Sequence, residues 1–196
     1  PTVDVGAGAE HTPYRWNGLT WEHRGLGYVN ERVVGTQFTA WHYVAAVRPA
    51  LPPPLRAITW FGADDHSWSP KIPLHGGTTK VHKSYDDGNC SARLACREAL
   101  GLPGSMMAFS WESAFWVNSA VANLLYGMRD RAAPAVRHAQ ERFDAEWANR
   151  TAAVEGEVAE LCGGGGRSCT AVLDELAVEA GAAATARWTL LWQQLM

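Results

Sequence analysis

Two neighbouring acids, Asp64 and Asp65, follow the short run LRAITWFG at residues 55–62 after a single alanine. The β-branched and aromatic residues of this run, closed by a glycine, predict a buried strand. Carboxylates at the end of a strand can line a binding site, but they can equally well solvate a turn. The pair is therefore a candidate site, and its chemistry depends on what the rest of the chain brings beside it.

The four cysteines fall in two close pairs, Cys90 with Cys96 and Cys162 with Cys169. Neither pair is a CxxC motif or has a histidine at zinc-finger spacing, so metal and thioredoxin-like sites are not indicated. None of the four is flanked by the base and oxyanion donors that a nucleophile requires. Short-loop disulfides are the simpler prediction for an oxidising compartment, and this segment then shows no nucleophile of its own.

Two sequons add to this picture, since Asn89 and Asn149 each precede a residue followed by Ser or Thr. Both are glycosylation candidates, although such triplets also arise by chance. Together with the paired cysteines, they favour a secretory or lysosome-like location over the cytoplasm.

Other motifs of catalysis are missing from the sequence. The seven histidines are scattered, without HExxH, and there is neither a GxSxG elbow nor a P-loop. We therefore expect no metal and no cofactor.

The bulk composition is that of a folded globular chain, with 47% hydrophobic and 19% charged residues in 196. This length fits a single domain, residues 1–196. A net charge of −3 and a pI near 6.2 provide no basic surface, so we expect no nucleic-acid partner. No stretch reaches the roughly 18 to 20 apolar residues of a membrane span.

The elements around the acids come from residue periodicity. Residues 36–48 place Phe38, Trp41 and Ala45 at helical spacing, which predicts a helix ended by Pro49. Residues 63–104 lack helical periodicity and predict loops with one or two more strands.

The carboxyl-terminal ninety residues predict helices. Residues 110–126 are apolar nearly all round, residues 134–150 form an amphipathic pattern, and a last helix follows the glycines at 163–166. Asn118 lies within an aromatic stripe of the first helix and needs hydrogen-bond partners. It either bonds a neighbouring loop carbonyl or faces a substrate. Strands and loops first, then helices, indicate an α+β fold.

Three quoted stretches resemble one family. NERVVGTQFTAWHYVAAVRPALPPPLRAITWFGADD, SPKIPLHGG and GSMMAFSWESAFWVNSAVANLLY are similar, over about residues 30–147, to the carboxyl-terminal half of cysteine-dependent dipeptidases of the dipeptidase A type, with secernins as distant relatives. The resemblance implies a hydrolase of the N-terminal nucleophile class, with a four-layer αββα sandwich. In that class a leader is removed so that a cysteine becomes the first residue. Its thiolate attacks the amide carbonyl, and its own α-amino group is the base.

This chain departs from that pattern at its start, because position 1 is Pro and no cysteine precedes Cys90. The nucleophile is therefore expected upstream of Pro1, and the chain is expected to be the carboxyl-terminal portion of a longer hydrolase domain. Its partners would be the missing amino-terminal half and a dipeptide or small amide substrate. Alone, the segment is expected to be inactive and to expose apolar surface.

Two groups of residues in this segment are candidate substrate contacts. Arg32, with Thr36 and Gln37, is placed to take a substrate carboxylate. Asp64 and Asp65 are placed to bind the free amino group that distinguishes a dipeptide from a longer chain. A surface salt bridge or a helix cap is the alternative for each.

Two other functions stay open. One is a non-catalytic, secernin-like interaction protein that keeps the fold. The other is an acyl-amide hydrolase of the same superfamily, which a comparison of dipeptides with acyl amides would separate from a dipeptidase.

Overall fold

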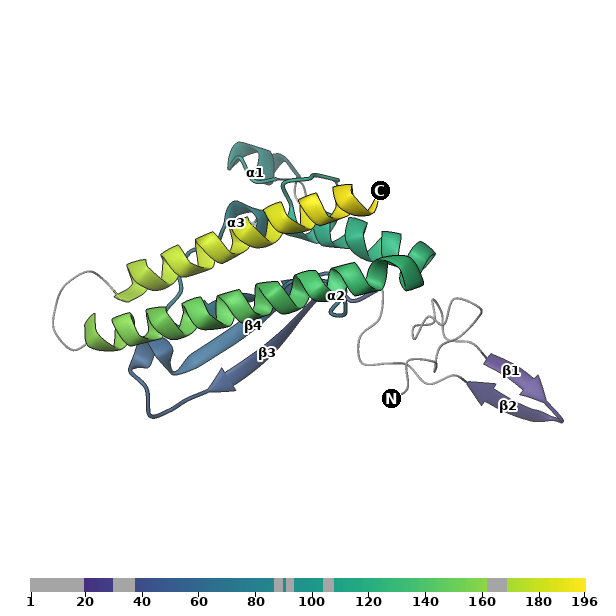
Figure 1. Cartoon of the computed structure of the whole chain (residues 1–196), viewed down its shortest axis with the longest axis horizontal. Coiled ribbons are helices and arrows are strands. Elements are labelled where there is room, and N and C mark those ends of the chain that lie inside the picture. The colour runs from purple at the N-terminus through teal and green to yellow at the C-terminus, as the bar shows by residue number, and fades with distance from the viewer. Residues whose placement is uncertain (1–19, 30–37, 87–89, 91–93, 104–107, 162–168) are drawn as a thin grey trace.

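The computed structural model describes residues 20–29, 38–86, 90, 94–103, 108–161 and 169–196. Strands precede the main helices, as the α+β prediction requires (Figure 1). The elements are β1 (Thr20–His23), β2 (Leu26–Val29), β3 (Trp41–Val47), η1 (Pro53–Leu55), β4 (Ala57–Ala63), β5 (Ile72–His75), η2 (Lys83–Tyr85), α1 (Leu94–Ala99), α2 (Ala114–Leu161) and α3 (Cys169–Leu195).

The first two strands form an antiparallel hairpin of their own. Arg24 and Gly25 make its turn with positive φ angles of 52° and 73°. Glycine suits this left-handed region because it has no Cβ to clash with the backbone.

The second sheet is antiparallel, in the order β3-β4-β5. Its β4 is the strand predicted from residues 55–62. The helix predicted at residues 36–48 is wrong, because all seven residues of β3 pair with β4, from Trp41 opposite Ala63 to Val47 opposite Ala57. Aromatic and β-branched side chains favour this extended pairing. The described strands leave the other edge of β3 unpaired, and most of its side chains are exposed.

The two helices predicted at residues 110–126 and 134–150 are joined in one element, α2. The break between them is a kink at Met128, whose dihedrals (φ −147°, ψ 41°) are not helical. The last predicted helix is α3, which runs back along α2 (Figure 1). The second half of the fold is therefore a long helical hairpin.

Large aromatic side chains fill the core between the helices and the sheet. Phe143 and Trp147 of α2 are fully buried, and the Trp188 ring of α3 meets Phe143 edge to face at 5.7 Å. The Trp188 indole also donates to the Trp68 carbonyl at 2.8 Å, which satisfies its buried N–H. Burial of each such ring stabilises the fold by about 1.5 to 3 kcal/mol.

A polar cluster ties the sheet to α2. The carboxylate of Glu155 accepts two hydrogen bonds from Arg48 at 2.7 and 2.8 Å, and one from Nε2 of His75 at 2.7 Å. Burial lowers the pKa of His75, although its hydrogen bond to Glu155 and the charge of Glu155 oppose the shift. The imidazole is thus a neutral donor to the carboxylate, beside the partly buried Arg48 cation.

The disulfide prediction is confirmed for Cys90 and Cys96, which are bonded. Cys169 is disulfide-bonded as well. Cys162, the partner expected for it, lies outside the described residues, as does Asn89 of the first sequon. Asn149 of the second sequon is exposed on α2. Among the described residues, no helix has the length and apolar character needed to cross a bilayer.

Candidate functional site

The structure brings two of the candidate segments together at the end of β4. The buried Asn118 side chain of α2 donates from Nδ2 to the carbonyl oxygen of Ala63 at 3.0 Å, and Ala63 directly precedes Asp64. This bond is the kind of backbone contact that a buried amide needs. The remaining candidates, Arg32, Thr36 and Gln37, lie outside the described residues.

Asp64 has a left-handed backbone conformation and a carboxyl group with a raised pKa. Its φ of 68° lies in the left-handed region that few residues other than glycine, asparagine and aspartate adopt, and its N–H donates to the Ala40 carbonyl at 2.8 Å. The side chain is only 6% exposed. Burial raises the pKa of Asp64 to about 7, the charge of Asp65 adds to the effect, and the Asp65 backbone amide opposes it. The carboxyl group therefore exchanges its proton near neutral pH.

Asp65 is fully buried, and both of its carboxylate oxygens have partners inside the protein. Oδ1 accepts the backbone N–H of Ser67 at 2.9 Å, and Oδ2 accepts the hydroxyl of Tyr126. The backbone bond closes the turn after β4, and the tyrosine bond ties that turn to α2. Asp65 thus fixes the backbone on which Asp64 stands.

His42 of β3 is part of this cluster, although no pattern in the sequence indicates it. Its ring nitrogen Nδ1 lies 3.1 Å from the Asp64 carbonyl oxygen. Burial lowers its pKa, so the ring is neutral and Nδ1–H donates to that carbonyl. The other nitrogen, Nε2, is buried and has no hydrogen-bond partner among the described residues. The lone pair on Nε2 is therefore a buried hydrogen-bond acceptor without a donor in the described residues.

The position of His42 depends on Gly62, the residue opposite it in the β3–β4 register. A Cβ at position 62 would lie 2.3 Å from Cε1 and 2.4 Å from Nε2 of the imidazole. The glycine of the WFG sequence is therefore required for the ring to lie against β4. The register that places this histidine beside Gly62 comes from the pairing of β3 with β4, which no local sequence pattern reports.

A small aromatic pocket adjoins Asp64. It has a volume of about 190 Å³, and both Ala63 and Ala40, the latter bonded to Asp64 through its carbonyl, lie in its wall. Its aromatic lining is Trp41, Phe61, Tyr85 and Phe115. Burial raises the pKa of Tyr85 above its ordinary value, so the phenol stays protonated and can donate.

The turn after β4 thus carries a poorly solvated carboxyl group that titrates near pH 7, close to a neutral imidazole. The neighbouring pocket has polar as well as aromatic walls, since Asp86 and Arg97 also line it. Within the part of the chain that the structure describes, no three His, Cys, Asp or Glu side chains are arranged to hold a metal ion. The described cysteines are all in disulfides, so they offer no thiolate.

Comparison with models of known protein families shows the family of this chain. The model of peptidase family C69 matches residues 4–142, which is more than half of the chain. The chain belongs to peptidase family C69. A comparison with curated proteins finds no match.

The C69 match agrees with the dipeptidase resemblance seen at residues 30–147. It includes the sheet β3-β4-β5, the turn at Asp64 and the first half of α2. The remainder of α2 and all of α3 lie beyond it. The candidate site of this C69 peptidase is therefore inside the matched region.

Proposed function

We propose that this C69 peptidase is a dipeptidase whose cysteine nucleophile lies in a part of the enzyme that precedes the present segment. The cysteine chemistry of the segment supports an upstream nucleophile, because Cys90, Cys96 and Cys169 are held in disulfides. In the proposed reaction the thiolate attacks the amide carbonyl and the carbon–nitrogen bond breaks. The α-amino group of the same cysteine passes a proton to the leaving amine, and water then hydrolyses the thioester.

Asp64 is the proposed contact for the free amino group of the substrate. The raised pKa of its carboxyl group is the main support for this proposal. A raised pKa means that the folded protein gives the carboxylate too little solvation or positive charge. A substrate ammonium group would supply that charge and stabilise the ionised acid. Asp65 and His42 act as positioning residues, because one fixes the turn and the other bonds the Asp64 carbonyl.

The opposite end of the substrate would be bound by residues of the matched family region. Arg32, Thr36 and Gln37 stay the proposed contacts for the substrate carboxylate, since a guanidinium can bind it through two hydrogen bonds. A dipeptide has both charged ends, so binding of both ends at once would select substrates of dipeptide length.

Strand β3 supports the proposal that further chain completes the sheet. Its side chains Trp41, Tyr43, Val44 and Val47 are 57% to 78% exposed, on both faces of the strand. An exposed, apolar strand with an unpaired edge tends to associate with other strands. Strands from an amino-terminal half would cover it and build the four-layer αββα sandwich.

A substrate comparison on the enzyme purified from its source, with matched variants of the full-length protein, tests the dipeptidase proposal. The substrates are a dipeptide, its N-acetylated form and an acyl amide. Asp64→Asn should raise KM for the dipeptide at least tenfold and leave the acetylated substrate unaffected; Asp130→Asn, exposed on α2, is the control. Faster cleavage of the acyl amide would favour the acyl-amide hydrolase instead. No cleavage, with a first residue other than Cys, would favour the non-catalytic interaction protein.

A further inference from the structure

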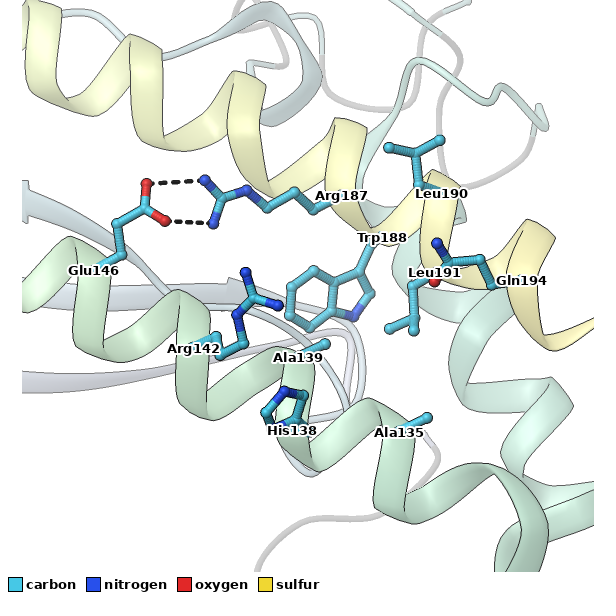
Figure 2. Close-up of a pocket in the computed structure, with 10 residues that line it drawn as sticks. All are labelled: Ala135, His138, Ala139, Arg142, Glu146, Arg187, Trp188, Leu190, Leu191 and Gln194. Atoms are coloured by element: carbon cyan, nitrogen blue, oxygen red, sulfur yellow. Dashed lines mark hydrogen bonds and ion pairs between the residues drawn. The ribbon is translucent and has the colours of Figure 1, made fainter.

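A groove runs between α2 and α3, away from the Asp64 turn. It has a volume of about 540 Å³, within the range of about 300 to 1,000 Å³ typical of small-molecule sites. Figure 2 shows its walls, with Ala135 to Glu146 on α2 and Arg187 to Gln194 on α3. The α3 wall lies beyond the region that matches peptidase family C69. The family relationship therefore assigns it no role.

The floor of the groove is apolar. Trp188 is 1% exposed and Leu191 is 7% exposed, and both belong to the hydrophobic core. At the rim, Leu190 is 56% exposed, so an alkyl chain in the groove would cover an apolar side chain that water now contacts. Burial of each methylene group is favourable by about 0.8 kcal/mol.

The charges of the groove do not balance. Glu146 is neutralised by Arg187 through two hydrogen bonds of 2.7 and 2.8 Å, and Arg187 is held over the Phe143 ring at 5.5 Å. The hydrogen bond from Arg187 lowers the pKa of Glu146, so this acid stays ionised and paired. Arg150 and Arg142 are near enough to lower that pKa as well. Arg142 forms no ion pair among the described residues, whereas Arg150 is paired with Glu179.

One positive charge is thus left at the wall of a groove whose floor is apolar. Figure 2 shows the Arg142 guanidinium rising from α2 in the direction of α3, while Arg187 extends toward Glu146. A guanidinium binds a carboxylate through two parallel hydrogen bonds. An added ammonium group would find no unpaired acid among the groove residues, since Glu146 is already paired.

We propose that this groove binds a small carboxylic acid with an alkyl chain, with its carboxylate on Arg142 and its chain on Trp188 and Leu191. The proposal is independent of the peptidase site. The expected ligand is a monoanion with one apolar chain, and not a zwitterionic amino acid or an uncharged alcohol of the same length.

Isothermal titration calorimetry with three probes of equal chain length tests it: octanoate, 1-octanol and 2-aminooctanoate. We expect octanoate to bind at least tenfold more tightly than the other two. Equal binding of octanoate and octanol, tighter binding of 2-aminooctanoate, or no binding of octanoate would overturn the proposal.

Three variants locate the site. Arg142→Gln should weaken octanoate binding about tenfold, whereas Arg131→Gln, exposed elsewhere on α2, should leave it unchanged. Ala135→Trp adds bulk from an exposed position and should abolish binding without disturbing the core. Circular dichroism and Tm confirm that each variant folds.

Octanoate binding that survives both Arg142→Gln and Ala135→Trp contradicts the proposed site. A change of oligomeric state in Ala135→Trp, with no octanoate binding by the parent protein, would show instead that the groove is an interface between copies.

Discussion

The Tyr126 hydroxyl donates a hydrogen bond to Oδ2 of Asp65, and this bond joins α2 to the turn after β4. Tyr126→Phe would leave a fully buried carboxylate with one donor fewer. We expect the free energy of unfolding to fall by about 1.5 to 3 kcal/mol, measured by urea denaturation. Tyr43→Phe, at a ring 57% exposed on β3, is the control and should change it little. Equal stabilities for the two variants would mean that the Tyr126 bond contributes nothing.

Gly62 provides a second test, because its missing Cβ leaves room for the His42 ring. We expect Gly62→Ala to displace the imidazole and to lower the free energy of unfolding by about 1 to 3 kcal/mol. Gly156→Ala is the matched control on α2, where an added Cβ meets nothing within 4 Å. It should instead stabilise the helix by about 1 kcal/mol. A Gly62→Ala protein with parental stability and an unshifted His42 imidazole resonance contradicts this packing.

Asp64 predicts a dependence of stability on pH. Its folded pKa of about 7 is above the value near 3.8 expected for the unfolded chain, so folding favours the protonated acid. The stability from this group is present in full below about pH 3.8 and is lost as pH rises through 7. Asp64→Asn keeps a residue that tolerates positive φ and removes this loss.

The free energy of unfolding of Asp64→Asn should therefore exceed that of the parent by about 2 to 4 kcal/mol at pH 8. Below pH 4 the two proteins should be equally stable. Urea unfolding at both pH values measures the difference, with Asp130→Asn as an exposed control that should show none. A difference between Asp64→Asn and parent that is the same at both pH values would show that the carboxyl group titrates normally.

The exposed strand β3 predicts how residues 1–196 behave by themselves. We expect them to bind a dye such as anilinonaphthalene sulfonate and to associate, because Trp41, Tyr43 and Val47 present apolar surface. Tyr43→Lys combined with Val47→Lys should reduce both effects, and Leu26→Lys on the β1–β2 hairpin should reduce them less. A monomeric, cooperatively unfolding protein without dye binding would mean that β3 needs no cover.

The sequence predicts the helical half of the fold well. Residues of α2 and α3 carry apolar positions at helical spacing over many turns, and this signal depends on local periodicity. The first half was harder to predict because β3 is exposed on both faces and shows no alternation of apolar and polar residues. Phe38, Trp41 and Ala45 happen to fall at helical spacing, and pairing with β4 outweighs that pattern.

The candidate site was only partly predictable for the same reason. The position of Asp64 and Asp65 at a strand end was visible in the sequence, and so was the buried amide at position 118. His42 could not be added, because its place beside Gly62 depends on strand pairing between segments twenty residues apart. The acidity of Asp64 also depends on tertiary burial, which no local pattern reports.

The amino-terminal sequence and intact mass of the protein isolated from its source test the central proposal most directly, before and after treatment with iodoacetamide. We expect a chain longer than 196 residues that begins with cysteine, gains one carboxamidomethyl group at that residue and loses dipeptide hydrolysis as it does so. A native chain that begins at Pro1, with no companion polypeptide and no alkylated thiol, would contradict an upstream nucleophile.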